Sequence, residues 1–315
     1  MARQVLAVDI GGTKLAAGLV DDDGAVLASD RTPTTPGASG EELWDTLVGL
    51  TKRVLAGAGS PDVVGVGVGS GGPMRWPEGE ISPLNIAGWR DFPLRARFQE
   101  RYPDLPVRVH NDAVAVAIAE HWRGAAQGTE NMLGMVVSTG VGGGLVLGGH
   151  VVDGATGNAG HIGHTVVDAD GPSCVCGGVG CLEAVARGPA LAQWAYERGW
   201  RTDRPEEDRT GRDLGADALA GDDLAVAAFA RAGHALGIAI ASAKALCDIE
   251  VVAIGGGIAQ VGDLLFSPLQ ERLDRHAGFD FTRRVRVVPA ALGQDAGLVG
   301  AAALVHQGDR YWSAD

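Results

Sequence analysis

The sequence is poor in cysteine, in long apolar runs and in positive charge, and each shortage excludes a class of protein. Four cysteines in 315 residues are too few for a disulfide scaffold. No uninterrupted apolar run approaches the ~18 residues that a membrane span needs. Residues 1–3 do not begin a signal peptide. We therefore expect a cytoplasmic protein with no membrane partner.

Basic residues are outnumbered by acidic ones, 26 to 39, which gives a formal net charge of −13. Affinity for nucleic acid comes mostly from neutralising phosphates with Lys and Arg, so we expect no nucleic-acid partner. A free nucleotide can still bind, because backbone N–H groups and a magnesium ion supply positive potential locally. The length exceeds what one hydrophobic core usually serves, which favours two lobes.

Glycine, in contrast, is abundant, and its 49 residues concentrate in short patches. The patches follow apolar, β-branched runs, which are typical of strands. Repeated strand-then-glycine patterns predict an α/β protein whose turns approach a ligand closely. The four patches cover residues 11–12, 65–72, 140–144 and 255–257.

The order of elements favours an actin-like ATPase (ribonuclease H-like) fold. Three strands, a helix and a strand are expected in sequence at residues 4–9, 15–20, 25–29, 41–56 and 63–68. A Rossmann unit would instead place its helix after the first strand. Strands at 132–138 and 145–147 open a second lobe with a similar plan.

The remaining elements follow from apolar periodicity. The charged stretch 202–213, which carries Pro205, predicts a solvated loop with no assigned function. We expect helices at 112–122, 182–198, 223–246 and 263–276, and strands at 106–110, 251–254 and 285–288.

Three glycine turns are candidates for nucleotide binding. In residues 9–14 a carboxylate ends a strand, and the turn after it can present backbone N–H groups to a phosphate while the carboxylate holds magnesium. Residues 138–144 repeat this arrangement, although either turn alone also fits an ordinary hairpin. The patch at 255–257 can let the backbone approach a ribose or adenine. The candidate residues are Asp9, Gly11, Gly12, Thr13, Lys14, Thr139, Gly140, Gly256 and Gly257.

Asn111 and Asp112 lie where a predicted strand meets a predicted helix. A carboxylate at that position is a candidate general base, which takes the proton from a sugar hydroxyl as its oxygen attacks the γ-phosphate. The alternative is that the pair only caps the helix.

A histidine and three clustered cysteines form the strongest local pattern. One His and three Cys complete a tetrahedral shell, and a shell with no open position implies a structural zinc. The histidine is either His161 or His164, because both precede the cysteines. Glu183 follows the last cysteine and is either a sugar ligand held rigidly by the knuckle or a carboxylate that favours the first turn of a helix. The cysteines are Cys174, Cys176 and Cys181.

Together these motifs resemble the repressor, open-reading-frame, kinase (ROK) family of bacterial sugar kinases and regulators. The resemblance runs from residues 9–14, through the cysteine knuckle at 174–183, to residues 295–302. It implies an actin-like fold of two lobes, with ATP, magnesium and a sugar in the cleft between them, a structural zinc, and a homodimer or homotetramer. The lobes are expected at 1–113 plus 299–315 and at 114–298, with the zinc loop at about 158–184.

The resemblance also assigns roles to residues. It makes Asp112 the catalytic base and Asn111 its sugar-binding neighbour. Further sugar contacts are Asn85, His164 and Glu183. The zinc ligands are His164, Cys174, Cys176 and Cys181. The residues around the phosphates and magnesium are Asp9, Gly12, Thr13, Thr139 and Gly140.

His161 departs from the common glucokinase pattern of the family, which has Glu at this position. Imidazole can donate a hydrogen bond and a carboxylate only accepts, so the contacts at the C1 and C2 end of the sugar should differ. The form His161-Ile162-Gly163-His164 is similar to the N-acetylmannosamine kinases of the family. We therefore expect ATP-dependent phosphorylation of the 6-hydroxyl of a hexose or N-acetylhexosamine, with N-acetylmannosamine favoured and glucose as the alternative.

The alternative from another class is a sugar-responsive transcriptional regulator of the same family. Such regulators carry a DNA-binding helical domain before the first phosphate turn, whereas here the first predicted strand begins at residue 4. This position and the acidic charge favour the enzyme.

Overall fold

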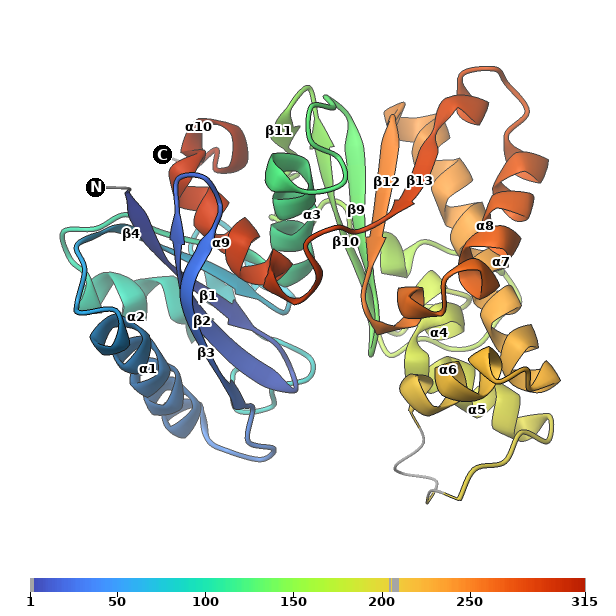
Figure 1. Cartoon of the computed structure of the whole chain (residues 1–315), viewed down its shortest axis with the longest axis horizontal. Helices are drawn as coiled ribbons and strands as arrows, with labels where there is room; N and C mark the ends of the chain where they lie inside the picture. Colours follow the sequence, from blue (N-terminus) through green and yellow to red (C-terminus); the bar gives the residue numbers. More distant parts are fainter. Residues whose placement is uncertain (1–2, 204, 206–209, 315) are drawn as a thin grey trace. The chain divides into compact units, whose positions relative to one another are not determined.

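The computed structural model describes residues 3–203, 205 and 210–314, and the chain forms two compact units whose elements are labelled in Figure 1. Unit 1 comprises Met1–Gly128, Gly144–Gly160 and Leu292–Asp315. Unit 2 comprises Thr129–Gly143 and His161–Ala291. These units differ from the lobes expected from the sequence, chiefly because the helix after Asn111 belongs to unit 1. The lobe boundaries themselves stay a prediction.

Unit 1 is built on a five-stranded sheet with the order expected of the actin-like fold. The first three strands are antiparallel neighbours, and the two later strands run parallel to the first. The carboxyl ends of the three parallel strands therefore meet at one edge of the sheet. In sheet order the strands are β3 (Val26–Pro33), β2 (Lys14–Asp21), β1 (Gln4–Ile10), β4 (Val63–Ser70) and β8 (Val107–Asn111).

Side chains of β1 alternate between two cores, so this sheet is covered on both faces (Figure 1). Leu6 and Val8 pack with side chains of α1 and α2, whereas Val5 and Ala7 pack with side chains of α9. The predicted helix at 41–56 is confirmed as α1. The helices of unit 1 are α1 (Gly40–Gly57), α2 (Leu94–Arg101), α3 (Asp112–Arg123), α9 (Ala296–His306), α10 (Gly308–Tyr311) and the 3-10 helix η5 (Gly293–Asp295).

Short strands complete unit 1. The chain enters unit 2 at Thr129 and returns to unit 1 through a glycine-rich strand. A small three-stranded sheet contains β5 (Met74–Arg75), β6 (Glu80–Ile81) and β7 (Phe92–Pro93). The glycine-rich strand is β10 (Val141–Leu147), whose end pairs with β11 (His150–Val151). It crosses the boundary between the units at Gly143 and Gly144.

Unit 2 has a parallel core of three strands, in which β12 lies between β9 and β13. Long helices pack together in this unit, α7 against α8 and against the shorter α4, α5 and α6. The strands are β9 (Met132–Val137), β12 (Val251–Gly255) and β13 (Arg286–Pro289). The helices are α4 (Leu182–Ala186), α5 (Gly188–Glu197), α6 (Gly211–Leu219), α7 (Asp223–Cys247) and α8 (Asp263–His276), with 3-10 helices η1 (Ile162–His164), η3 (Gly257–Val261) and η4 (Thr282–Arg284).

Two predicted segments of unit 2 were wrong in detail. The single helix expected at 182–198 is two helices. Arg187 between them is extended (φ −67°, ψ 148°), and Pro189 lies in the first turn of the second helix, because inside a continuous helix it would lack an N–H donor and clash with the carbonyl four residues earlier. The loop expected at 202–213 ends earlier, since α6 begins at Gly211. Thr210 and Asp213 form a capping box there, which the charge of the segment obscured. Residues 204 and 206–209 lie outside the described residues.

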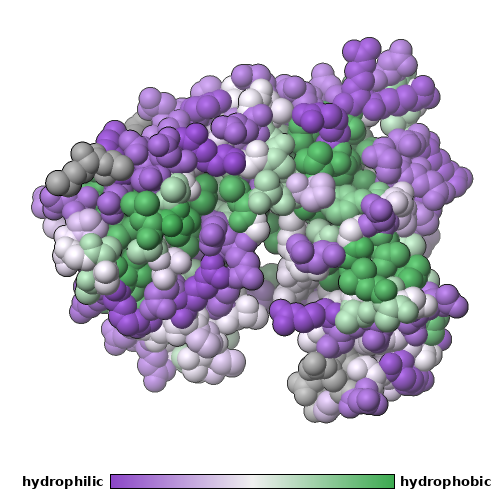
Figure 2. All heavy atoms as spheres, in the orientation of Figure 1, coloured by the Kyte–Doolittle hydropathy of each residue, from purple (hydrophilic) through white to green (hydrophobic). Residues whose placement is uncertain are grey.

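Within the described part of the chain, α7 is the one helix long and apolar enough to cross a membrane. Its most apolar window is 61% buried, which is typical of a core helix. Gly237 in α7 lies so close to α8 that a Cβ would be 2.7 Å from the Leu269 carbonyl oxygen. The apolar character of α7 is therefore explained by packing inside unit 2. Hydrophilic side chains cover much of the face shown in Figure 2, with apolar patches among them.

Candidate active site and metal centre

Two carboxylates lie at the edge of the sheet in unit 1 where the parallel strands end. Asp9 is the next-to-last residue of β1, and Asp112 follows the last residue of β8. Gly69 of β4 lies between them: a Cβ there would be 3.6 Å from Asp112 Cα and 3.9 Å from Asp9 Oδ1. The absence of a side chain at Gly69 leaves the space between the carboxylates open.

The protonation of both carboxylates is shifted by burial. Burial, together with the neighbouring Asp9 carboxylate, raises the pKa of Asp112 to about 6. Burial also raises the pKa of Asp9, against the opposing effect of the Lys14 and Arg31 cations. A carboxyl with a pKa near the operating pH is suited to proton transfer, because it is ionised at neutral pH and still basic enough to accept a proton.

The cap of α3 is made mainly by Asn111 rather than by Asp112. Asn111 Oδ1 accepts hydrogen bonds from the N–H groups of Ala113 (3.0 Å) and Val114 (3.4 Å). Asp112 uses only Oδ1 locally, accepting from Ala113 N–H at 2.8 Å. Its Oδ2 faces Gly71, where a Cβ would lie 3.9 Å away. The capping alternative therefore accounts for Asn111 and leaves one oxygen of Asp112 for chemistry.

The first glycine turn is closed by its own backbone and lies against Asn85. Gly11 N–H donates to the Lys14 carbonyl at 2.9 Å. The Thr34 hydroxyl donates to the Gly11 carbonyl at 2.8 Å, an anchor that the sequence motif did not indicate. A Cβ on Gly12 would lie 2.6 Å from Asn85 Cβ, so the predicted sugar residue and the predicted phosphate turn are neighbours.

The second glycine turn is held by Glu183. Ser138 N–H donates to the Gly140 carbonyl at 2.8 Å, and Val141 N–H donates to Glu183 Oε2 at 2.8 Å. A Cβ on Gly140 would be 2.9 Å from that same oxygen. One oxygen of the predicted sugar ligand is thus engaged with the turn, while its role toward a sugar stays a prediction.

The third glycine patch has a packing explanation. Gly256 has φ +95°, a backbone conformation that favours glycine. Any Cβ there would collide with the backbone of Val137 in β9. The close approach that we expected to a nucleotide is, at Gly256, an approach to the neighbouring strand. A nucleotide contact at Gly257 stays a prediction.

The predicted zinc residues lie together in unit 2. The ligand atoms of His164 and the three cysteines are all within 4.8 Å of one another. His164 Nδ1 lies 3.9 Å from Cys174 Sγ, and the sulfurs of Cys176 and Cys181 are 3.7 Å apart. With Zn–S distances of about 2.3 Å, sulfurs in a tetrahedral shell are about 3.8 Å apart, so the donor set fits zinc.

Of the two candidate histidines, His164 belongs to this cluster. His161 lies beside the cluster, and the centroids of the His161 and His164 rings are 6.1 Å apart. Burial and the neighbouring thiols raise the pKa of Cys181 to about 12. A cation in the cluster is therefore needed to keep this sulfur as a thiolate at neutral pH.

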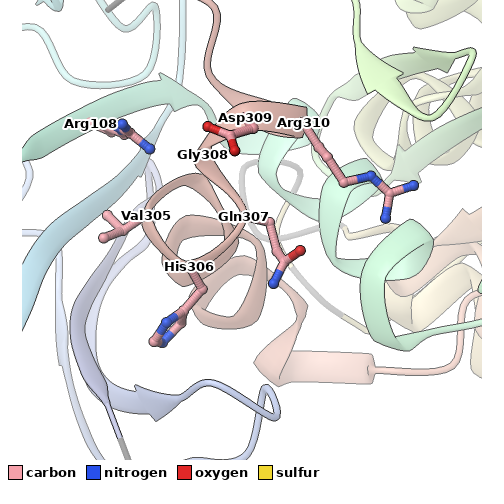
Figure 3. A pocket seen from close by; sticks show the side chains of 7 residues that line it. All are labelled: Arg108, Val305, His306, Gln307, Gly308, Asp309 and Arg310. Carbon is pink, nitrogen blue, oxygen red and sulfur yellow. The ribbon is translucent and has the colours of Figure 1, made fainter.

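Unit 1 also has a shallow pocket beside α10, which Figure 3 shows. It is lined by Arg108 and residues 305–310, and none of the predicted site residues line it. The Arg108 guanidinium donates to the Leu304 carbonyl at 2.8 Å, which ties the side chain to α9. We assign no function to this pocket.

The chain is similar to known proteins along nearly its whole length. The model of the ROK family matches residues 5–308. A glucokinase of Halalkalibacterium halodurans is 33% identical over 97% of this chain and 96% of its own length. An N-acetylmannosamine kinase of Shigella boydii is 36% identical over 97% of this chain and 99% of its own.

Solved structures lead to the same family. A ROK family glucokinase from Streptomyces griseus, in complex with glucose and AMPPNP, is 34% identical with a TM-score of 0.84. The match covers 97% of this chain and 100% of that one. The chain therefore belongs to the ROK family, as the sequence motifs predicted.

Proposed function

We propose that this kinase of the ROK family transfers the γ-phosphate of ATP to the 6-hydroxyl of N-acetylmannosamine. The observation that carries the proposal is the half-buried carboxyl of Asp112, whose pKa is raised to about 6 at the strand edge that also holds Asp9 and lies beside the first glycine turn. A base of this kind is what phosphoryl transfer to a sugar hydroxyl requires.

Asp112 acts first on the sugar. Its ionised carboxylate accepts the proton of the 6-hydroxyl while that oxygen forms a bond to the γ-phosphorus, and the bond from phosphorus to the leaving ADP oxygen breaks. Asn111 and Asn85 hold the sugar, and the two glycine turns present backbone N–H groups to the phosphates. The products are the sugar 6-phosphate and ADP.

Asp9 is the residue that would hold magnesium or its water. Its carboxylate is an oxygen ligand of the kind that Mg²⁺ prefers. When bound, magnesium offsets the charge of the phosphates, which is most of what catalysis of phosphoryl transfer demands.

Zinc would be held by His164, Cys174, Cys176 and Cys181, and its role is structural. Four protein ligands leave no open position for a substrate or water. The last ligand is followed within two residues by Glu183, whose carboxylate fixes the second glycine turn. The metal would therefore stabilise both a predicted sugar ligand and a predicted phosphate turn.

The preference for N-acetylmannosamine rests on His161. Its imidazole can donate a hydrogen bond where a glutamate only accepts, which changes recognition at the C1 and C2 end of the sugar. Glucose is the second candidate, because glucokinases and N-acetylmannosamine kinases among the relatives have similar identity to this chain. The cytoplasmic location, the oligomeric state and the absence of a nucleic-acid partner stay predictions.

A kinase assay with ATP across glucose, mannose, N-acetylglucosamine and N-acetylmannosamine tests the proposal. We expect the highest kcat/KM for N-acetylmannosamine. In His161→Glu the ratio of glucose to N-acetylmannosamine activity should rise by about tenfold, the scale of one hydrogen bond to a charged group. His150→Glu, which adds the same charge at an exposed histidine, is the matched control and should leave the ratio unchanged.

The outcomes separate the parts of the proposal. Glucose turnover far above that of the N-acetylated sugars contradicts the sugar preference and leaves the kinase activity. No phosphorylation of any of the four sugars contradicts the kinase assignment on these substrates.

A further inference from the structure

A chain of polar side chains, buried at His110 and Asp153 and exposed at Ser313, lies behind Asn111, and the chemistry above does not use it. His110 is the next-to-last residue of β8, and its side chain is fully buried. Its Nε2 lies 2.9 Å from Asp153 Oδ1, and Ser313 Oγ donates to Asp153 Oδ2 at 2.7 Å. Asn111 N–H donates to His110 Nδ1 at 2.8 Å. These residues all belong to unit 1.

The hydrogen bonds of the His110 ring determine where its proton lies. Nδ1 accepts from a backbone N–H, so it carries no proton, and the ring proton is on Nε2, where it is donated to the Asp153 carboxylate. Both ring nitrogens are therefore satisfied. Leaving either nitrogen unpaired in the interior would be unfavourable, so the ring is held firmly in one orientation.

This ring fixes the peptide group that leads into Asn111, one residue before Asp112. The chain leaves β8 at Asn111 with φ −62° and ψ 142° and enters α3 at the next residue. The Asn111 side chain holds the first turn of α3, and His110 holds the Asn111 N–H from the opposite direction along the chain. The backbone on which Asp112 stands is thus tied on both sides.

The far end of the chain of hydrogen bonds is anchored by the C-terminal residues. Ser313 reaches Asp153, and Trp312 beside it packs edge-on against Trp76, with ring centroids 5.6 Å apart. The Arg95 guanidinium carbon lies 5.1 Å from the Trp312 ring centroid. Trp76 in turn packs 6.4 Å from the His110 ring. These contacts bring residues from four separate segments behind the same strand end.

We propose that His110 and Asp153, supported by Ser313, are positioning residues that set the geometry of Asn111 and Asp112 for phosphoryl transfer. This inference rests on the proposed function. None of the three touches the reacting atoms; they act through the backbone of Asn111. Because a misplacement of about 1 Å can cost about a hundredfold in rate, weakening the network lowers kcat.

Two substitutions at His110 separate its two hydrogen bonds. His110→Asn keeps an acceptor near the position of Nδ1, for Asn111 N–H, and loses the donor to Asp153. His110→Gln keeps a donor near the position of Nε2 and loses the acceptor. We expect kcat to fall by at least about tenfold in His110→Gln and by a smaller factor in His110→Asn, with the KM for ATP changed by less than about twofold.

The matched control is another buried histidine of unit 1, His121, whose Nδ1 lies 2.6 Å from the Tyr311 hydroxyl. Tyr311→Phe removes that hydrogen bond, so it should lower Tm and leave kcat within about twofold of the wild type. A readout independent of turnover is the ¹⁵N NMR spectrum of the histidine rings. It should show one ring protonated at Nε2, with a slowly exchanging proton that is lost in His110→Asn.

Folded His110→Gln protein with the kcat of the wild type would overturn the inference. If the His110 variants do not fold, Asp153→Asn decides, since it keeps the shape and removes the charge that orients the ring. A kcat lowered about fivefold supports the inference, and an unchanged kcat overturns it. Wild-type protein that phosphorylates none of the four sugars defeats the proposed function instead, a result that these variants cannot mimic.

Discussion

The two glycine turns look alike in sequence but are held in different ways. The turn at residues 9–14 is closed by its own backbone and by the hydroxyl of Thr34 at the end of the neighbouring strand. The turn between β9 and β10 also has a backbone hydrogen bond of its own, from Ser138 N–H to the Gly140 carbonyl, but its side-chain anchor is Glu183, just after the cysteine cluster. A similar motif is thus anchored by a hydroxyl 23 residues away in unit 1 and by a carboxylate 42 residues away, next to the cysteine cluster, in unit 2.

The residues that surround the two turns also differ in their chemistry. The turn of unit 1 shares its sheet edge with two carboxylates of raised pKa, whereas the turn of unit 2 neighbours the cluster of His164 and three cysteines, which would hold a cation with no open position. We therefore expect substitutions of the two carboxylates at the sheet edge of unit 1 to act mainly on kcat. Substitutions around the second should act on stability and on the KM for ATP.

The largest effect is expected at the carboxylate of unit 1. Asp112→Asn removes the proposed general base and keeps the shape of the side chain. We expect kcat to fall by roughly two orders of magnitude or more, while the sugar Kd, measured by calorimetry, changes little. Asp91→Asn, a change at a carboxylate away from the strand edge, is the control. Near-normal turnover in Asp112→Asn would defeat the assignment of the base.

The zinc knuckle offers the next largest effect. Purified protein should hold about one zinc per chain, and Cys176→Ala should lose it. Loss of the metal should lower Tm and raise the KM for ATP through Glu183 and the second turn. Cys247→Ala, outside the cluster, is the control. Metal analysis that finds no zinc in protein with full activity would contradict this account of the knuckle.

Glu183 tests the link between knuckle and turn more finely. Glu183→Ala removes the acceptor for Val141 N–H, and we expect the KM for ATP to rise by about tenfold. Glu183→Gln keeps an oxygen at that position, so its KM for ATP should lie between that of the wild type and that of Glu183→Ala. Equal values in both variants would show that the charge, and not the hydrogen bond, is what matters.

The smallest effect is expected at Thr34. Thr34→Val removes the hydroxyl that donates to the Gly11 carbonyl and keeps the volume of the side chain. Because the backbone hydrogen bond of the first turn remains, we expect only about a threefold rise in the KM for ATP, the scale of one neutral hydrogen bond. A rise in the KM for ATP as large as that of Glu183→Ala would mean that both turns depend equally on their anchoring side chains.

Much of the fold followed from the sequence because most elements have a clear period. The strands of the five-stranded sheet of unit 1 were predicted within a few residues, whereas its short strands β5, β6, β7 and β11 were not; helix α1 has its apolar side chains on one buried stripe. Helix α9 was not predicted. It is apolar on all sides and carries Gly297 and Gly300, so it lacks the amphipathic period that marks a helix, and its burial on the sheet determines its structure.

The residues of the candidate site were likewise predicted only in part. The cysteine cluster and the two turns were visible as short motifs, since their residues are close in sequence. The contacts of His110 with Asp153 and of Thr34 with Gly11 join residues 43 and 23 positions apart, which no local pattern indicates. Gly297 is a further case: a Cβ there would lie 2.6 Å from Asp9 Oδ2, so it lets α9 approach the carboxylate.

The central claim is that Asp112 is the base, and the pH dependence of kcat/KM for the preferred sugar tests it most directly. Above the raised pKa the carboxyl is ionised and accepts a proton; below it the carboxyl is protonated and inactive. We predict that kcat/KM falls tenfold per pH unit below about pH 6 and that this limb is absent from the residual activity of Asp112→Asn. A wild-type profile that stays flat down to pH 5, in protein that remains folded, would contradict the claim.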